Sequence, residues 1–292
     1  MNKIIVWFRQ DFRLLDNPAL SDAVNSGAIL PIFIHDTNTP KDLAIGSASK
    51  LWLYYTLNSF NHSIAGNLQI YSGNPLTILT NLTKQYNITQ INWNRCYNKY
   101  QIEMDHEIES SLNNQGIKIK TFNGSLLWEP CEIIKADGTP YKVFTPYYRR
   151  GCLNASPPRT PLAKPTRINY ISTKSKTAIK DKDLKLIAST MLSANWATNI
   201  IKGWDVSENG AHIALNNFIQ HKLNNYKTAR NIPSLNGTSR LSPYLSFGQI
   251  SPNVIWHKLH ALEFNDNIDT YCSELGWREF SYYLLYYFPN LY

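Results

Sequence analysis

Hydroxyl, cationic and glycine residues are concentrated in the stretch from Gly237 to Pro252, which reads GTSRLSPYLSFGQISP. Ser242 before Pro243 predicts a helix N-cap followed by proline at the first helical position, and Ser251 before Pro252 repeats the arrangement. Two helix N-termini so close together leave backbone N–H groups free to bind an anion. Side chains in the same stretch add hydroxyl donors and a positive charge: Thr238, Ser239, Ser242 and Arg240. The stretch therefore predicts a cradle for a phosphate-bearing cofactor, and the alternative is two ordinarily capped helices.

A second group of side chains suited to binding lies near the end of the chain, at Glu274, Trp277 and Arg278. On a helix these residues lie within one turn and on one face. The indole offers a stacking surface, and the carboxylate can accept a hydrogen bond from a base edge, so the group could bind a pyrimidine pair flipped out of DNA. The alternative, which spacing alone favours, is a Glu274–Arg278 salt bridge with Trp277 packed in the core.

Both groups match sequence motifs of one family, and a third match opens the chain. The stretch from Gly237 to Pro252 resembles the flavin-binding motif of the photolyase/cryptochrome family, TSxLSPYLxxGxIS. Glu274–Phe280 is close to the family's ELxWREF, and Trp7–Arg13 with Asp16–Leu20 is close to its WFRxDLRxxDNxAL. These matches follow the family's order along the whole chain, which is thus similar to DNA photolyases and most of all to class I cyclobutane pyrimidine dimer photolyases.

The resemblance implies a carbon–carbon lyase that repairs cyclobutane pyrimidine dimers in DNA by light-driven electron transfer from reduced, anionic FAD. The positions that match cofactor-binding residues of the family are Tyr226, Thr238, Ser239, Arg240, Leu241, Ser242, Tyr271, Glu274 and Arg278. The positions that match DNA-binding residues are Arg230, Glu274, Trp277 and Arg278. Of these, Glu274 and Trp277 are expected to contact the damaged bases as catalytic residues. The expected partner is damaged DNA, and no protein partner is implied.

Several positions separate branches of the family. Members that repair the (6-4) product, and animal cryptochromes, tend to have Gln where this chain has Glu274, so the resemblance favours cyclobutane dimers. The wording LSPY, rather than FSPW, argues against the DASH cryptochromes. Tyr271 stands where some members have a Trp beside the flavin. On residue type alone, Tyr226 would be a helix-packing aromatic and Arg230 a solvated arginine.

The N-terminal part of the family can hold a second, light-harvesting chromophore. Gly46–Ala48 followed by Leu51–Leu53 resembles a helix start in members with deazaflavin or flavin antennae, and Phe33–Asp36 lies at a strand end where a ring could dock. The family's YEP segment appears here as Tyr97–Lys99, and the glutamate that holds a folate is matched by Gln101. A folate is therefore not expected, which leaves a chromophore of another kind or an empty site.

The composition favours a polyanionic partner. The 292 residues include 29 Lys and Arg against 21 Asp and Glu, a net charge of +8, and phosphate neutralisation releases counterions. The four cysteines are scattered, as expected for reduced thiols in a cytoplasmic protein. Only His257 and His260 have close helical spacing among the histidines, so no metal site is expected. No apolar run approaches the ~18 residues of a membrane span.

Apolar runs alternate with segments of helical spacing in the first part of the chain. The runs predict buried strands at residues 3–8, 28–34, 68–71, 90–93 and 117–122. Pro31 is an objection to the second strand, because proline cannot donate to a ladder. Asn17 and Asn74, each before a proline, predict helix caps. The alternation predicts an α/β antenna domain with a doubly wound parallel sheet over residues 1–130, which would bind ligands at the carboxyl ends of its strands.

After residue 130 the periodicity loosens. Prolines between Pro157 and Pro165, and lysines between Lys174 and Lys185, predict an interdomain connector over residues 131–200. Within it, Tyr141–Tyr147 resembles the family's YKVFTPF segment. Helical spacing returns afterwards, so residues 201–292 are expected to form the first part of an all-α FAD-binding domain.

The chain ends at Tyr292, where the helical domain of the family continues. The resemblance therefore implies a truncated FAD-binding domain without the tryptophans that deliver electrons to the flavin. Such a domain would expose apolar faces, which predicts marginal stability or self-association. Two alternatives stay open: a cryptochrome-type flavin photoreceptor without repair activity, and a non-catalytic nucleotide- or DNA-binding fragment.

Overall fold

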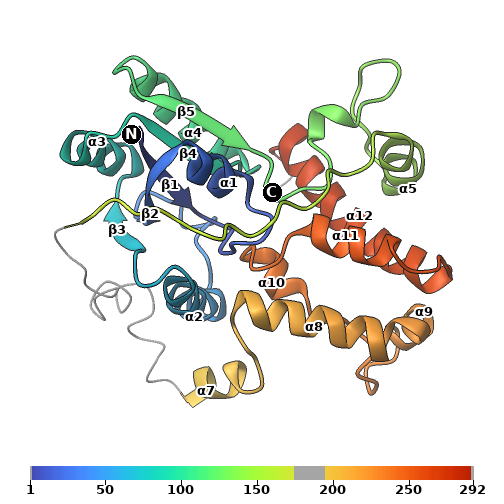
Figure 1. Ribbon diagram of the computed structural model, residues 1–292. Helices are drawn as coiled ribbons and strands as arrows, with labels where there is room; N and C mark the ends of the chain where they lie inside the picture. The colour runs from blue at the N-terminus through green and yellow to red at the C-terminus, as the bar shows by residue number, and fades with distance from the viewer. Residues whose placement is uncertain (1, 174–194, 291–292) are drawn as a thin grey trace.

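In the computed structural model, which describes residues 2–173 and 195–290, a five-stranded sheet forms the first part of the molecule (Figure 1). Its strands are β1 (Asn2–Phe8), β2 (Gly27–Asp36), β3 (Gln69–Gly73), β4 (Gln90–Asn94) and β5 (Lys118–Phe122). The strand order is β3-β2-β1-β4-β5, and every pairing is parallel. The predicted doubly wound α/β sheet is confirmed. Its order reverses between β1 and β4, where sheets of this kind bind ligands at the carboxyl ends of the strands.

Helices cover both faces of the sheet: α1 (Pro18–Ser26), α2 (Ser47–Ser63), α3 (Pro75–Tyr86) and α4 (Lys99–Asn113). Leu20 of α1 shares one apolar core with Val6 of β1, whereas Leu79 of α3 shares a second core with Trp7. Val6 and Trp7 are neighbours in one strand, and their side chains enter opposite cores because successive strand residues point to opposite faces. The long apolar run of β1 is thereby explained, since the strand is buried on both faces.

The predicted caps are present, and the proline in the second strand is accommodated. Asn17 and Asn74 each accept a hydrogen bond from a backbone N–H in the first turn of the helix that follows. Pro31 lies in β2, whose pairing with β3 begins only at Ile32. Ile29 exchanges backbone hydrogen bonds with the segment at residues 169–171, so Pro31, two residues later, faces the same side of the strand. Its missing N–H therefore falls between two pairing partners, where no ladder bond is lost.

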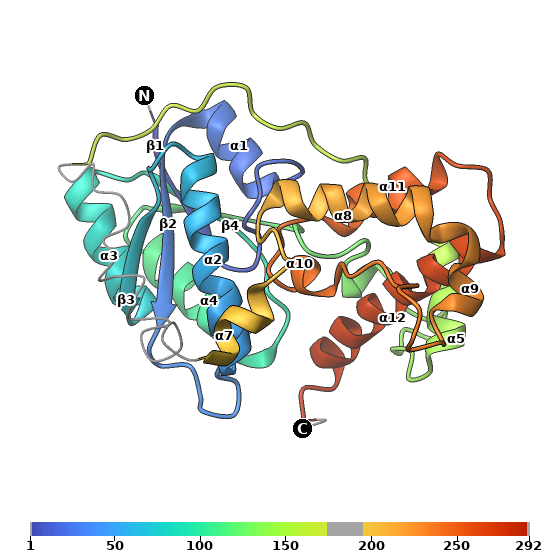
Figure 2. The ribbon, with the colours of Figure 1, turned by 90° about the horizontal axis from the view of Figure 1, so that it is seen from below.

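The second part of the molecule is helical (Figure 2). Its helices are α5 (Phe144–Pro146), which continues into a π-helical turn at Tyr147–Gly151, α7 (Asn195–Ile201), α8 (Glu208–His221), α9 (Tyr226–Ala229), α10 (Ser242–Ser246), α11 (Pro252–His260) and α12 (Asp266–Tyr287). Short 3₁₀ turns occur at Pro130–Glu132, Cys152–Asn154 and Leu223–Asn225. The longest of these helices, α8, α11 and α12, account for the helical spacing that the sequence shows after residue 200.

The region predicted as a connector contributes to both parts of the molecule. Phe144, Tyr147 and Tyr148 are buried in the apolar core of the helical part. The segment after Cys152–Asn154 runs back over the sheet, where Ile29 forms an isolated parallel bridge with Tyr170 (Figure 2). The lysines between Lys174 and Lys185 lie outside the described residues. The division into residues 1–130, 131–200 and 201–292 stays a prediction.

Arg13 joins the two parts of the molecule. Its buried guanidinium donates hydrogen bonds to the carbonyl oxygens of Asp16, Gly124 and Gly248. Gly248 lies in the loop between α10 and α11, and its φ of +65° belongs to the left-handed region that favours glycine. A Cβ atom at Gly248 would lie 1.9 Å from the carbonyl oxygen of Gln10. This loop therefore depends on glycine both for its conformation and for its contact with the N-terminal segment.

We expect Gly248→Ala to lower the free energy of unfolding by about 2–4 kcal/mol, because the left-handed strain and the overlap with backbone add together. Gly138→Ala is the matched control, since Gly138 has a φ of +78° and open space around its Cβ position. It should cost only about 1 kcal/mol. Urea unfolding of the variants measures both effects, and equal losses would contradict the close contact at Gly248.

Candidate functional site

The hydroxyl-rich loop before α10 differs in detail from its prediction. Helix α10 begins at Ser242, its N-cap is Leu241, and no side chain caps it. The prediction that Ser242 is the cap is therefore wrong. The hydroxyl that accepts the Leu241 N–H, at 3.3 Å, belongs to Ser239. Helix α10 is only 5 residues long, so its dipole adds little to anion binding.

The second predicted N-terminus is present, and its capping side chain also bonds a carboxylate of the protein itself. Ser251 caps α11 by accepting the Asn253 N–H at 3.0 Å, as predicted. Its hydroxyl also donates to the carboxylate of Asp16, and both residues are fully buried. The idea that this N-terminus is free for a cofactor phosphate is therefore wrong, because the terminus is buried and its Ser251 hydroxyl already donates to Asp16.

Positive charge nevertheless surrounds the loop. The exposed Arg240 places its guanidinium 3.9 Å above the centre of the Trp204 ring, and Lys222 at the end of α8 donates to Asn236 Oδ1 and to the carbonyl of Thr238. Partial burial, and then the charge of Arg240, lower the pKa of Lys222. Within residues 2–173 and 195–290, no carboxylate lies within ion-pair distance of Lys222 or Arg240. This unneutralised charge lies beside exposed side chains of Thr238 and Ser242, an arrangement suited to a phosphate.

Lys222 was not found by sequence reasoning. It follows helix α8 directly and precedes the Thr238 carbonyl that it contacts by 16 residues, a separation that no local motif spacing covers. A general preference for cations near hydroxyl-rich loops would not distinguish it from the other lysines of the chain.

The two motif segments meet at Ser239 and Tyr271. The Tyr271 hydroxyl on α12 donates to Ser239 Oγ at 2.9 Å. The Tyr271 ring packs on Phe218 of α8 and on Tyr226 of α9, with ring centres 4.5 Å and 5.0 Å apart. Tyr226 is buried in this cluster. The loop before α10 and the face of α12 that bears Tyr271 are therefore in direct contact.

The charged residues of α12 pair differently from the predicted alternative. Glu274 forms an ion pair with Arg230 at the end of α9. Arg278 donates instead to the carbonyl of Ser125 and to Glu279, at 2.8 Å and 2.9 Å. The Glu274–Arg278 salt bridge is therefore wrong. Tyr271, Glu274 and Arg278 still share one side of the helix, and along it they contact three different segments of the chain.

Trp277 is not a core residue. Its side chain is 47% exposed, and one face of the indole stacks on Phe144, with ring centres 3.8 Å apart and planes 13° apart. The packed alternative for Trp277 is therefore wrong. An indole that is covered on one face and open on the other can stack with a flat ligand.

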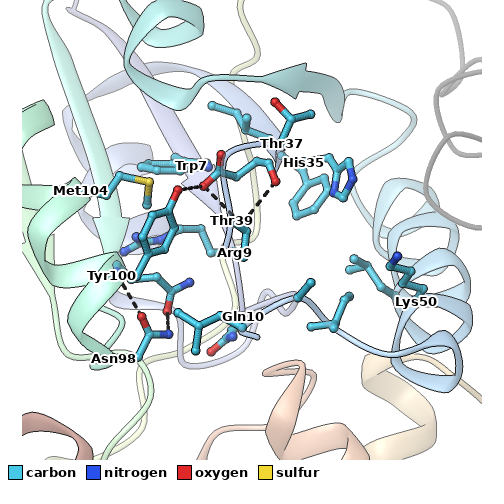
Figure 3. A pocket seen from close by; sticks show the side chains of 18 residues that line it. Trp7, Arg9, Gln10, His35, Thr37, Thr39, Lys50, Asn98, Tyr100 and Met104 are labelled. Carbon is cyan, nitrogen blue, oxygen red and sulfur yellow. Dashed lines mark hydrogen bonds between the residues drawn. The ribbon is translucent and has the colours of Figure 1, made fainter. Parts of the chain in front are cut away.

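A second candidate site lies at the carboxyl ends of β1 and β2, between α2 and α4 (Figure 3). Its cavity has a volume of about 450 Å³ and includes the predicted ring-docking residues 33–36 as well as Gln101. Arg9 forms one wall, where it bonds both carboxylate oxygens of Asp105 and the carbonyl of Asn94. Burial acts to lower the pKa of Arg9, but the charge of Asp105 and its hydrogen bonds outweigh burial and leave that pKa raised above its ordinary value. The wall is thus charge-neutral and rigid.

Trp7 and Arg9, which both line this cavity, each have a buried donor without a partner in the described part of the chain, namely the indole Nε1 and the guanidinium Nε. A buried donor with no acceptor is costly, so both atoms indicate that a ligand or water supplies one. On the opposite side, the Tyr100 hydroxyl donates to Asp36 at 2.6 Å. Burial and that carboxylate raise the pKa of Tyr100 to about 12.

Neither a metal-binding cluster nor a membrane-spanning helix is found among the described residues. Among residues 2–173 and 195–290, no group of three or more His, Cys, Asp or Glu side chains is placed to hold a metal ion. Within the same ranges, none of the helices combines the length and the apolar character that crossing a bilayer requires.

Glu279 is the fully buried carboxyl group of the motif on α12. It accepts the backbone N–H of Leu127 at 2.7 Å and a hydrogen bond from Arg278. Burial raises the pKa of Glu279 to about 7, although Arg278 and the backbone donors oppose the shift. The carboxyl therefore links α12 to the segment that follows the sheet, in the same region as Ser125.

Comparison with known proteins supplies a family context. A family model described as DNA photolyase matches residues 4–166. Over 99% of its length the chain is 32% identical to the deoxyribodipyrimidine photo-lyase of Agrobacterium fabrum, and over 98% it is 29% identical to cryptochrome-2 of Arabidopsis thaliana. A solved bacterial class III photolyase from Agrobacterium tumefaciens covers 100% of the chain with a TM-score of 0.90 and 30% identity. The chain spans 60%, 49% and 60% of the lengths of these proteins, respectively.

We expect Glu279→Gln to change how stability depends on pH. The folded state holds the proton of Glu279 more tightly than the unfolded state, where the pKa is near 4.5. Its contribution is therefore fully present below pH 4.5 and is lost as the pH rises through about 7. Relative to Glu279→Gln, the unmodified chain should lose on the order of 3 kcal/mol of unfolding free energy over this range. Urea unfolding at several pH values measures the difference, and parallel curves would show that the carboxyl is not perturbed.

Proposed function

Because the chain belongs to the DNA photolyase family, we propose that it provides the cofactor cradle and the lesion-binding face of a deoxyribodipyrimidine photolyase. The observation that carries the proposal is the hydrogen bond between Ser239 and Tyr271, which joins the motif expected to hold the cofactor to the helix expected to meet DNA. Separate placement of these segments would leave no common cleft.

The cradle suits the phosphates of FAD. Lys222 and Arg240 supply positive charge, and the hydroxyls of Thr238, Ser239 and Ser242 supply donors that the short α10 cannot. When bound and reduced, the flavin supplies the electron that light transfers to the dimer. Tyr271 and Tyr226 are buried beside the loop and Leu241 is buried within it, so these side chains fix the loop that carries the hydroxyls.

Glu274 and Trp277 have complementary roles at the face turned to DNA. The open side of the Trp277 indole would stack with one base of a flipped dimer, and Glu274 would accept a hydrogen bond from its edge. In the free chain Arg230 neutralises Glu274. A DNA phosphate would compete with Glu274 for Arg230, which couples backbone binding to release of the carboxylate. Arg278 is held at Ser125, so its predicted contacts with FAD and DNA require that bond to be exchanged.

The finer assignments stay proposals. The chain is most like class I enzymes in its motifs, whereas the solved relative is a class III photolyase, so the class stays a prediction. Cryptochrome-2 of Arabidopsis thaliana is also similar, which keeps a photoreceptor without repair as the second function. Repair is favoured over that function by the presence of both Glu274 and an open Trp277.

The decisive experiment uses the 292-residue chain reconstituted with FAD, reduced, and illuminated with an oligonucleotide that contains one cyclobutane thymine dimer. Retention of FAD, preferential binding of the damaged strand and recovery of intact thymines support photolyase function. Retention of FAD without recovery of thymines would favour the photoreceptor, and loss of both cofactor and damage preference would reject the proposal.

We expect Trp277→Ala to weaken binding of dimer-containing DNA about tenfold, because base–aromatic stacking contributes roughly 1–3 kcal/mol per base. FAD retention should be unchanged, since Trp277 lies outside the cradle. Tyr286→Ala is the matched control, because Tyr286 is another exposed aromatic residue of α12, at 41% exposure. Competition binding on damaged and undamaged strands measures the effect, and equal affinities before and after would make Trp277 a packing residue.

The cavity at the carboxyl ends of β1 and β2 supports a second chromophore site. A flat heteroaromatic ring with acceptor atoms on one edge would pack against the wall formed by Trp7 and Arg9, whose Nε1 and Nε donors lack a partner among the described residues. Flavins and deazaflavins have such an edge. Gln101 in the lining, where folate-binding members have glutamate, argues against a folate.

Filling the cavity provides the test. Met104→Trp places a large ring in the lining, and Ser110→Trp places the same ring on the exposed side of α4. Titration with FMN as the probe should show at least about tenfold weaker binding for Met104→Trp, because overpacking removes the space for a ring. Ser110→Trp should bind like the unmodified chain. Equal binding by all three proteins would place FMN elsewhere.

A further inference from the structure

Three aromatic rings from two segments form a single stack beneath the open face of Trp277. Phe144 stacks on Trp277 with ring centres 3.8 Å apart, and Tyr148 lies behind Phe144 with centres 5.6 Å apart. The planes differ by only 13° and 8°. Phe144 is 9% exposed and Tyr148 is 1% exposed, so the rings behind the indole are fixed in the core.

The stack is possible because residue 276 of α12 is glycine, which has no side chain. A Cβ atom at Gly276 would lie 2.5 Å from Cδ2 of Tyr148 and 2.7 Å from its Cε2. The Tyr148 ring therefore lies directly against the helix backbone, one residue before Trp277. Tyr148 is presented by the π-helical turn at Tyr147–Gly151, a rare element that is frequent at functional sites.

We propose that Phe144, backed by Tyr148 and Gly276, is the positioning element that holds the Trp277 indole as a platform for one base of the damaged DNA. The inference rests on the proposed function and adds residues from a segment that sequence analysis treated as a connector. Phe144 acts through Trp277 and does not itself touch the base.

The division of exposure supports positioning over simple packing. A parallel phenyl ring at 3.8 Å covers much of one face of the indole, so most of the 47% exposure of Trp277 belongs to the other face and the ring edge. A core tryptophan would be covered on both faces. An exposed tryptophan without support would sample several rotamers and would lose that freedom on stacking with a base. Fixing the ring beforehand removes this cost from binding.

The experiment compares Phe144→Leu, Phe144→Tyr and Gly276→Ala in the full chain labelled with 5-fluorotryptophan. The Trp277 fluorine resonance is assigned by its loss in Trp277→Phe. Tyr147→Leu is the matched control, because Tyr147 lies in the same turn as Tyr148. Its ring contacts Tyr141, Phe280 and Tyr283 and is not part of the stack on Trp277. Gly276→Ala is a second route to the same defect, since alanine favours the helix but displaces Tyr148.

Phe144→Leu and Gly276→Ala should move the Trp277 resonance and weaken binding of a thymine-dimer oligonucleotide about fivefold, because an aromatic pair adds stability beyond its buried area. Affinity for the undamaged oligonucleotide should stay the same. Phe144→Tyr and Tyr147→Leu should preserve both readouts. If Phe144→Leu does not fold, Gly276→Ala carries the test.

Two results would overturn the role of Phe144 and leave the proposed function intact. One is a Trp277 resonance that does not move in Phe144→Leu and Gly276→Ala. The other is a resonance that moves in these variants while their affinity for the dimer stays unchanged, although Trp277→Ala loses affinity. A different result separates failure of the proposed function. If Trp277→Ala also keeps its full affinity for the dimer, the indole is not the lesion platform, and the role of Phe144 falls with it.

Discussion

The buried guanidinium of Arg13 is the interaction on which the relation between the two parts of the molecule depends. It donates to carbonyl oxygens of three segments, at Asp16, Gly124 and Gly248. Burial lowers the pKa of Arg13, while nearby Asp16 opposes the shift. A buried cation is stable only when its donors are satisfied. Moving any of these segments away would leave a donor of Arg13 without an acceptor, and this free-energy cost holds the segments together. The loop from Asn236 to α11 and the sheet thereby keep a fixed relation.

The N-terminal motif at residues 7–20 also fixes charged groups in the interior. The Asp16 carboxylate accepts the Ser251 hydroxyl at the start of α11, whereas the charges of Lys222 and Arg240 are not paired with any described carboxylate. Arg9 is neutralised by Asp105, and its Nε has no partner among the described residues. Two arginines of one short motif thus serve different purposes. One closes the contact between the sheet and the helices, and the other forms the wall of a candidate chromophore site.

Much of the fold could be predicted because its signals are local. Short apolar runs indicated all five strands, and Asn17 and Asn74 indicated two helix starts through the spacing of a cap and a proline. The errors have two different causes. Ser242 does not cap α10 because it is already the first helical residue, with Leu241 as the N-cap. The α11 terminus is not free because it is buried and its Ser251 hydroxyl donates to Asp16, which lies far away along the sequence. Motif spacing cannot reveal such partners.

By itself, the sequence determined the strand and helix pattern, the order of the motifs and the residue types of the candidate site, because periodicity and composition are properties of neighbouring residues. Only the tertiary structure decided how those residues are used. It paired Glu274 with Arg230 in place of Arg278, and it set Phe144 behind Trp277. These contacts join segments far apart along the chain, and their geometry follows from packing, where a single absent Cβ at Gly276 decides which ring can approach.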